Sequence, residues 1–371
     1  MSPEVPAISG LLSARQVAAT AASVARMQEP DGAVPWTTGG HADTWNHVEA
    51  AMALLVGGQA DAAHRAYDWC LATQRPDGSW PMKVVAGVVD DASGETNMSA
   101  YLAVGVWHHW LVRRDERFVR RCWDAVRRGL DFVVGVQLPW GGIAWSVDPQ
   151  GRVDEDALLA GSSSIFQALA AGIALSELVD DPQPEWELAA GRLGHALREH
   201  RDLFLDKSTF SMDWYYPVLG GAVRGPDAHA LIAERWDTFV EPGLGIRCVS
   251  ENPWVTGAET CELVLALDAI GDRARALQLL ADMQHLRTAE GAYWTGYVFP
   301  TDRDEVGVNW PAEQTTYTAA AVILAVDALS EGTPGADIVR GTTLTPDFAE
   351  IGLECGCPSA ERVAGVAGRT A

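Results

Sequence analysis

A short segment, Phe210–Gly221, combines the residue types that a pocket for a polar ring would need. Its sequence, FSMDWYYPVLGG, places the carboxylate of Asp213 directly before the aromatic residues Trp214, Tyr215 and Tyr216. Consecutive aromatic residues point in different directions, so they cannot all lie on one buried stripe of a helix or strand. An acid and aromatic rings in a segment that ends in glycine suit the floor of a pocket that binds a sugar or another polyol. An irregular helix whose aspartate caps its own start is the alternative.

Two further acids, Glu259 and Glu313, stand at the predicted starts of apolar helices. Two carboxylates that flank a glycosidic bond can hydrolyse it, because one protonates the leaving oxygen and the other activates water. We predict Asp213 and Glu259 as this pair, with Glu313 as the replacement for either, and the sequence does not say which is the acid. Each glutamate also has a structural interpretation, since Thr256-x-x-Glu259 fits a capping box and Glu313 follows Pro311, a residue that favours helix starts.

The elements that must position these acids are helices of two alternating types. Charged, amphipathic helices are predicted at 13–27, 60–73, 116–136, 184–200, 227–240 and 273–285, and apolar, small-residue-rich helices at 44–57, 96–112, 161–178, 213–222, 257–270 and 313–330. An amphipathic helix buries one stripe, whereas an apolar helix is buried all round. The alternation therefore predicts an all-α (α/α)6 barrel with an outer and an inner ring, joined by short loops with β-hairpin character. An α-solenoid is the structural competitor.

In such a barrel the inner helices begin at one rim, so that residues distant in sequence share one opening. Carboxylates, aromatic rings and amides at these starts favour a saccharide site over an isoprenoid site, which would carry few acids. His47 and Glu49 point to different sides of their helix, so at most one of them faces the opening. The predicted substrate-binding residues are Trp45, His47, Asn97, Trp214, Tyr215, Tyr216, Trp310 and Tyr317.

A turn motif recurs where an outer helix is followed by an inner one. It reads Gln28-x-x-Asp31-Gly32 near the start of the chain and QRPDGSW at 74–80, with related segments after Gln137 and Gln284. We expect the glutamine to bond free carbonyls at the helix end, Asp-Gly to make the turn and tryptophan to cover the helix end. The motif is therefore interpreted as a stabilising device.

At this point the chain resembles known families of helical barrels. QRPDGSW resembles the Q-x-x-D-G-x-W motif of squalene cyclase and prenyltransferase toroids, and the six-pair layout resembles six-hairpin glycosidases of the glucoamylase kind, over about residues 10–330. The glycosidase resemblance implies hydrolysis by paired carboxylates at the barrel mouth. The cyclase motif D-x-D-D is incomplete, because the chain has Val88-Val89-Asp90-Asp91. Cys248 and Cys261 lack the histidine of a prenyltransferase zinc set.

Three functions follow from these observations. A carbohydrate-active enzyme of the glycoside hydrolase type is the first hypothesis, with a small-molecule or oligosaccharide substrate. The alternatives are a prenyltransferase- or terpene cyclase-like enzyme that acts on an isoprenoid, and a sugar-binding barrel without catalysis. Two carboxylates at hydrolytic spacing distinguish the first hypothesis from the last.

Composition limits the partners and the compartment. The 371 residues carry a formal net charge of −23, which disfavours nucleic acid and anionic membranes as partners. We find no apolar run of membrane-spanning length and no signal-peptide pattern, so we expect a cytoplasmic protein. The cysteines are too sparse for a disulfide scaffold, and we expect neither a cofactor nor a metal. The predicted domains are a toroid at 10–331 and a partly disordered C-terminal arm at 332–371.

Overall fold

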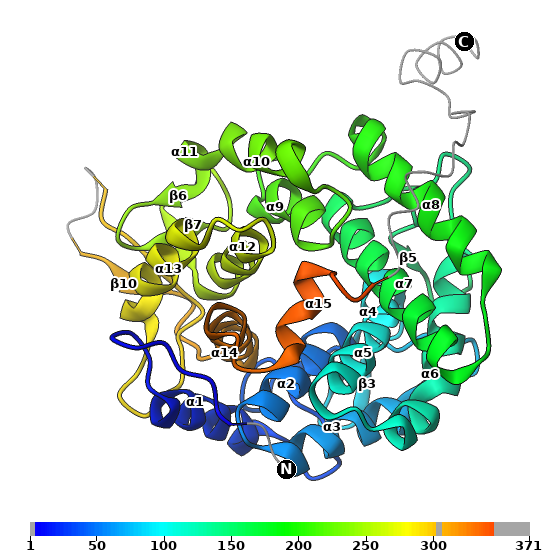
Figure 1. The fold of residues 1–371 in the computed structure, drawn as a ribbon, viewed down its shortest axis with the longest axis horizontal. Helices are drawn as coiled ribbons and strands as arrows, with labels where there is room; N and C mark the ends of the chain where they lie inside the picture. The colour runs from blue at the N-terminus through cyan, green and yellow to red at the C-terminus, as the bar shows by residue number, and fades with distance from the viewer. Residues whose placement is uncertain (1–3, 302–305, 345–371) are drawn as a thin grey trace.

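The structure, a computed structural model, describes residues 4–301 and 306–344. These residues form the predicted (α/α)6 barrel, in which an inner ring of helices is enclosed by an outer ring (Figure 1). The outer helices are α1 (Ala14–Met27), α3 (Ala60–Thr73), α6 (Glu116–Val134), α8 (Pro184–Glu199), α10 (Gly225–Glu234) and α13 (Arg273–Asp282). The inner helices are α2 (Thr44–Val56), α4 (Thr96–Ala100) with α5 (Leu102–Arg113), α7 (Leu159–Val179), α9 (Ser211–Leu219), α12 (Gly257–Ala269) and α14 (Thr316–Ser330).

The pattern of buried residues differs between the outer and inner helices, as the alternation predicts. In the outer helix α6 only the residues of one stripe are buried, among them Phe118, Cys122 and Val126, whereas almost every residue of α14 is buried. An inner helix touches neighbours on all sides, which explains its apolar, small-residue-rich sequence. Helix α7 corrects the expectation about apolar runs, because it is long and apolar enough to cross a membrane. However, 78% of its apolar window is buried inside the barrel, as in the core helix of a soluble protein.

The repeated glutamine cross-links consecutive outer helices. Gln74, at the end of α3, donates from Nε2 to the carbonyl oxygens of Gly78 and of Ala125 in α6, both at 2.8 Å. Gln28 makes the same pair of bonds to its own turn and to Ala62 of α3, and Gln137 does so to its turn and to Ala189 of α8. The predicted bonding to free carbonyls is confirmed at these three glutamines, where it also connects one outer helix to the next, whereas Gln284 donates to the carbonyl of Leu280 in α13.

Short antiparallel strands hold the starts of the inner helices. One sheet contains β1 (His41–Ala42), β2 (Lys83–Val85) and β3 (Val88–Asp91), and another pairs β4 (Gly94–Glu95) with β5 (Ser146–Val147). The largest sheet has the order β10-β9-β8-β7-β6, with bounds Val308–Asn309, Gly296–Val298, Trp254–Thr256, Gly245–Arg247 and Val240–Glu241. Since β1, β4 and β8 lead directly into α2, α4 and α12, strand pairing fixes where these helices begin.

The residues that follow α14 close the end of the barrel at which the inner helices finish. The 3-10 turn η3 (Pro334–Ala336) and the short helix α15 (Asp337–Arg340) lie in the centre of the ring (Figure 1). Gln167 of α7 donates to the carbonyl of Ile338 at 2.9 Å, and Arg340 donates to Asp268 at the end of α12 at 2.8 Å. The packed domain thus continues past the expected boundary at residue 331, and the predicted arm at 345–371 lies outside the described residues.

Candidate active site

A buried carboxylate, Glu262, lies under the mouth of the barrel. The hydroxyls of Tyr216 and Tyr317 each donate to it at 2.6 Å, and the hydroxyl of Tyr215 donates as well. Burial raises the pKa of Glu262 to about 7, although the three hydroxyls favour its ionised form. The tyrosines come from α9 and α14 and the acid from α12, so one carboxylate fixes three inner helices relative to one another.

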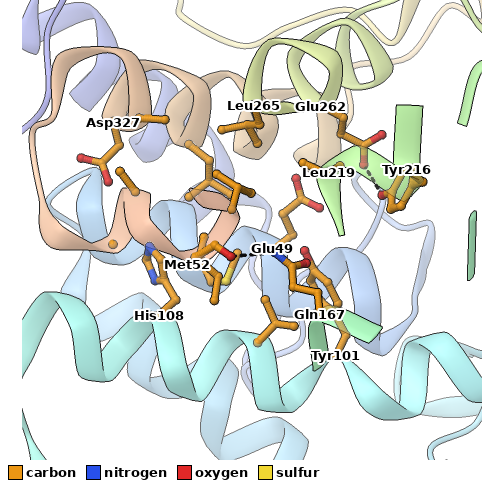
Figure 2. A pocket seen from close by; sticks show the side chains of 17 residues that line it. Glu49, Met52, Tyr101, His108, Gln167, Tyr216, Leu219, Glu262, Leu265 and Asp327 are labelled. Atoms are coloured by element: carbon orange, nitrogen blue, oxygen red, sulfur yellow. Dashed lines mark hydrogen bonds between the residues drawn. The ribbon is translucent and has the colours of Figure 1, made fainter. Parts of the chain in front are cut away.

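A second buried acid, Glu49 of α2, faces the same interior space. It lines, together with Glu262 and Tyr216, a small cavity of about 30 Å³ between the mouth and α15 (Figure 2). Burial raises the pKa of Glu49, and the charge of Glu262 raises it further. Above the pKa of Glu262 we therefore assign the proton of this pair to Glu49 and the negative charge to Glu262, which has the three donors.

Above this pair, aromatic rings line the mouth. The ring of Trp45 lies 5.5 Å from that of Tyr317, 5.9 Å from Tyr101 and 6.3 Å from Tyr216. Trp36, which comes from the loop after α1, lies 5.4 Å from Tyr317. Trp45 and Trp36 are only partly buried, and such rings offer apolar faces on which a sugar can stack.

Two partly exposed carboxylates adjoin this aromatic group. Glu313 accepts a hydrogen bond from the indole nitrogen of Trp36 at 3.1 Å. Glu259 lies in the first turn of α12; burial raises the pKa of Tyr317, and the charges of Glu262 and Glu259 add to this rise. The thiol of Cys248 makes a hydrogen bond with Glu259. Burial is the main cause that raises the pKa of this thiol, and the charge of Glu259 raises it further. Glu259 thus acts on Tyr317 through its charge, Glu313 is bonded to Trp36, which packs on Tyr317, and both acids are partly exposed.

The starts of α2 and α4 contribute two more buried acids, Asp43 and Glu95. Asp43 accepts from the backbone and side-chain nitrogens of Asn46 at 2.9 and 2.6 Å, and His41 lies 3.6 Å from it. Glu95 caps α4 by accepting from the Met98 backbone at 2.6 Å. Burial raises the pKa of Glu95 to about 8; the bond to Met98 opposes this rise and the charge of Asp43 adds to it.

Asp213, the third predicted catalytic acid, is bonded to the start of a neighbouring inner helix. Its Oδ1 accepts from the backbone nitrogen of Ala160 in the first turn of α7 at 3.2 Å. Burial raises the pKa of Asp213 to about 6. Asp213 lines a separate cavity with Trp214, and neither Glu259 nor Glu313 lines that cavity. The cavity thus does not bring Asp213 and Glu259 together as the predicted pair.

His47 faces away from the mouth, which corrects its predicted role in substrate binding. Its Nδ1 accepts from the backbone of Val34 at 2.9 Å and its Nε2 pairs with the carbonyl of Ala66 at 2.8 Å. Burial lowers the pKa of His47 to about 4, so the ring is neutral. Of His47 and Glu49, only Glu49 lines the interior cavity, in agreement with the prediction that at most one faces inward.

The other predicted binding residues lie in different surroundings. Trp214 is buried, donates its indole N–H to Leu231 at 3.0 Å and stacks on Phe239, so its ring is not available as a platform. Trp310 is 53% exposed and packs against Trp254 at the rim. Asn97 is buried, and its Oδ1 has no partner among the described residues. Trp45, Tyr216 and Tyr317 gather at the mouth as predicted.

Several residues of the site were missing from the predicted set. Glu262 follows Glu259 by three positions in a helix that is buried all round, and a buried acid requires partners, so this pattern could have singled it out. Trp36 comes from a loop without helical periodicity and gave no such signal. Within residues 4–301 and 306–344, no three His, Cys, Asp or Glu side chains gather as metal ligands would.

Comparison with known proteins agrees with this architecture. No family model matches the chain. Similar solved structures are a glycosidase (TM-score 0.65, 14% identity, 86% of this chain and 96% of that one), a D-mannose isomerase (0.64, 10%, 86% and 96%) and an α-amylase from Clostridium perfringens (0.59, 8%, 85% and 98%). At these identities the likeness shows the fold alone.

The barrel and its acid-lined mouth are those of an (α/α)6 glycoside hydrolase. A curated relative, the MMP endo-(1,4)-3-O-methyl-alpha-D-mannosidase of Mycolicibacterium hassiacum, is 53% identical over 358 residues, which are 96% of this chain and 98% of the relative. The chain belongs to the family of that endo-mannosidase. The isoprenoid alternative is therefore not favoured.

Proposed function

We propose that this protein is an endo-acting hydrolase of (1,4)-linked α-mannosides that carry 3-O-methyl groups. The observation that carries the proposal is the similarity to a relative named for this activity, which is 53% identical over almost the whole of both chains. The site supports the proposal, because acids and partly exposed rings meet at one mouth. The other end of the bore is filled by α15, so a long substrate would lie across the mouth rather than pass through the ring.

We assign the acid and base of the reaction to Glu259 and Glu313. Both are partly exposed, whereas Glu49, Glu95 and Glu262 are buried and already held by the protein or by one another. One of the two donates a proton to the glycosidic oxygen as its bond to the sugar carbon breaks. The other accepts a proton from the water whose oxygen forms the new bond to that carbon.

Asp43 is the alternative partner for Glu259. It lies at the same rim, and its charge raises the pKa values of Glu49 and Glu95. However, both of its oxygens accept hydrogen bonds from Asn46, and its side chain is 2% exposed. These contacts indicate that Asp43 fixes the start of α2. We therefore prefer Glu313 over Asp43 as the partner of Glu259 in the reaction.

The test is hydrolysis of (1,4)-linked oligo-α-mannosides with and without 3-O-methyl groups. We expect internal cleavage that is faster on the methylated chains, and a loss of about 100- to 10,000-fold in kcat for Glu259→Gln and Glu313→Gln. Glu251→Gln, at an exposed acid in the loop before β8, is the matched control and should leave kcat unchanged. Asp43→Asn belongs in the same series.

The outcomes test the proposed substrate class and the proposed pair of catalytic acids independently. If the wild-type protein cleaves another glycoside but none of these mannosides, the proposed substrate class is wrong. If Glu313→Gln keeps full activity while Asp43→Asn loses it with an unchanged melting temperature, Asp43 takes the place of Glu313. Full activity of Glu259→Gln would remove the pair altogether.

A further inference from the structure

A second cavity opens beside the mouth, between the starts of two inner helices. It has a volume of about 420 Å³, within the roughly 300–1,000 Å³ of small-molecule sites. Its lining includes Leu159 in the first turn of α7, Asp213 in the first turn of α9 and residues of the loop 201–208. The cavity is therefore on the rim at which the inner helices begin.

The polar lining of this cavity is balanced in charge. It contains the cations Arg201, Lys207 and Arg235 and the acids Asp202, Asp206 and Asp213. Equal numbers of opposite charges give no net attraction for an ion, and the chain's charge of −23 disfavours an anion further. Neutral molecules with many hydroxyls suit such a lining, because each hydroxyl can donate to a carboxylate and accept from a cation.

The polar groups are held in place, and the remaining wall is apolar. Arg235 donates to the carbonyl of Ser208 and stacks on Phe239, with its guanidinium carbon 4.8 Å from the ring centre. Arg201 donates to the carbonyl of Leu197 at 2.9 Å. Leu159, Phe204 and Leu231 contribute the apolar part of the lining. An apolar wall with a few fixed polar groups is the usual composition of a sugar pocket.

Buried rings extend from this cavity to Glu262 beneath the mouth. Trp214 lies 6.4 Å from Tyr215, whose hydroxyl is bonded to Glu262 beneath the mouth. We propose that the cavity is a distal subsite, which binds a sugar unit of the substrate chain at a distance from the bond that is cleaved. The inference rests on the proposed function, because an endo-acting enzyme holds several units of one chain. It gives Asp213 a role in substrate binding that does not require it to act in catalysis.

The experiment compares short and long oligo-α-mannosides in variants of the cavity. Lys207→Met removes one cation from the lining, and Lys83→Met makes the same change at an exposed position of strand β2, outside this cavity. Arg235→Met has the control Arg117→Met, an exposed position in the first turn of α6. We expect the cavity variants to lower kcat/KM about tenfold on long chains through KM, and to leave the shortest cleaved chain unaffected. Tenfold corresponds to about 1.4 kcal/mol, close to one hydrogen bond to a charged group.

The same experiment distinguishes the subsite from the proposed function. An unchanged ratio of long-chain to short-chain kcat/KM in both cavity variants, with wild-type melting temperatures, overturns the subsite and leaves the proposed function intact. If wild-type protein cleaves no mannoside, the proposed function fails. In that case calorimetric affinity for the long chains replaces kcat/KM, and the subsite stands only if Lys207→Met weakens binding and Lys83→Met does not.

Discussion

Removal of the Tyr317 hydroxyl should destabilise the protein more at alkaline than at acidic pH. This hydroxyl donates to Glu262, and burial holds the pKa of that acid at about 7, above its ordinary value of 4.5. Between these two values Glu262 is protonated in the folded state and ionised in the unfolded state. Stability therefore falls as the pH rises through this window. Tyr317→Phe raises the folded pKa of Glu262 further, because it removes a donor that favours the ionised form.

The size of the effect follows from the two protonation states. A hydrogen bond to a charged acceptor contributes about 1.5–3 kcal/mol and one to a neutral acceptor about 0.5–1.5 kcal/mol. Tyr317→Phe should thus cost about 1 kcal/mol more when Glu262 is ionised than when it is protonated. By linkage the same difference is a rise of about 0.7 in the pKa of Glu262.

The measurement is urea unfolding at about pH 5.5 and about pH 8.5, on either side of the folded pKa. Tyr293→Phe is the matched control, because this buried tyrosine donates at 2.8 Å to the neutral side chain of Gln284. Its cost should be the same at both pH values. An equal or smaller cost of Tyr317→Phe at the higher pH would show that Glu262 does not carry the charge assigned to it.

Two further predictions concern the turns and the helix caps. Gly78→Ala should cost about 2–4 kcal/mol in urea unfolding, because its φ is +93° and a Cβ would lie 2.1 Å from the carbonyl oxygen of Arg128. Gly87→Ala, at φ +74° with nothing within 4 Å, should cost about 1 kcal/mol. Glu95 has a folded pKa of about 8 against an ordinary 4.5, so it makes stability fall as the pH rises between these values. Glu95→Gln should flatten the corresponding decline in melting temperature, and an unchanged slope would contradict the assignment.

The fold could be predicted from the sequence because the position of each helix in the barrel is encoded in its own hydrophobic pattern. An amphipathic stripe in 116–136 and an apolar run in 313–330 specify a ring position without reference to any other segment. The elements that were missed depend on distant partners. Nothing local marks Ile338 for a bond to Gln167, and nothing in QRPDGSW shows that Gln74 also reaches Ala125 of the next outer helix.

The sequence predicted which acids lie at the rim of the barrel but not which of them act in the reaction. An acid at the start of an inner helix can either bond to a neighbouring helix start or point into the interior of the barrel. Helix starts leave backbone N–H groups unpaired, and in a ring each start lies beside those of its neighbours. Asp213 takes such a group from Ala160 on the adjacent α7, whereas Glu262, one turn further into α12, is directed to the tyrosines of the bore. Sequence spacing makes both residues rim acids, and only the packing of neighbouring helices decides between them. The carboxylates that remain partly exposed at the mouth, Glu259 and Glu313, are therefore the ones we assign to the reaction.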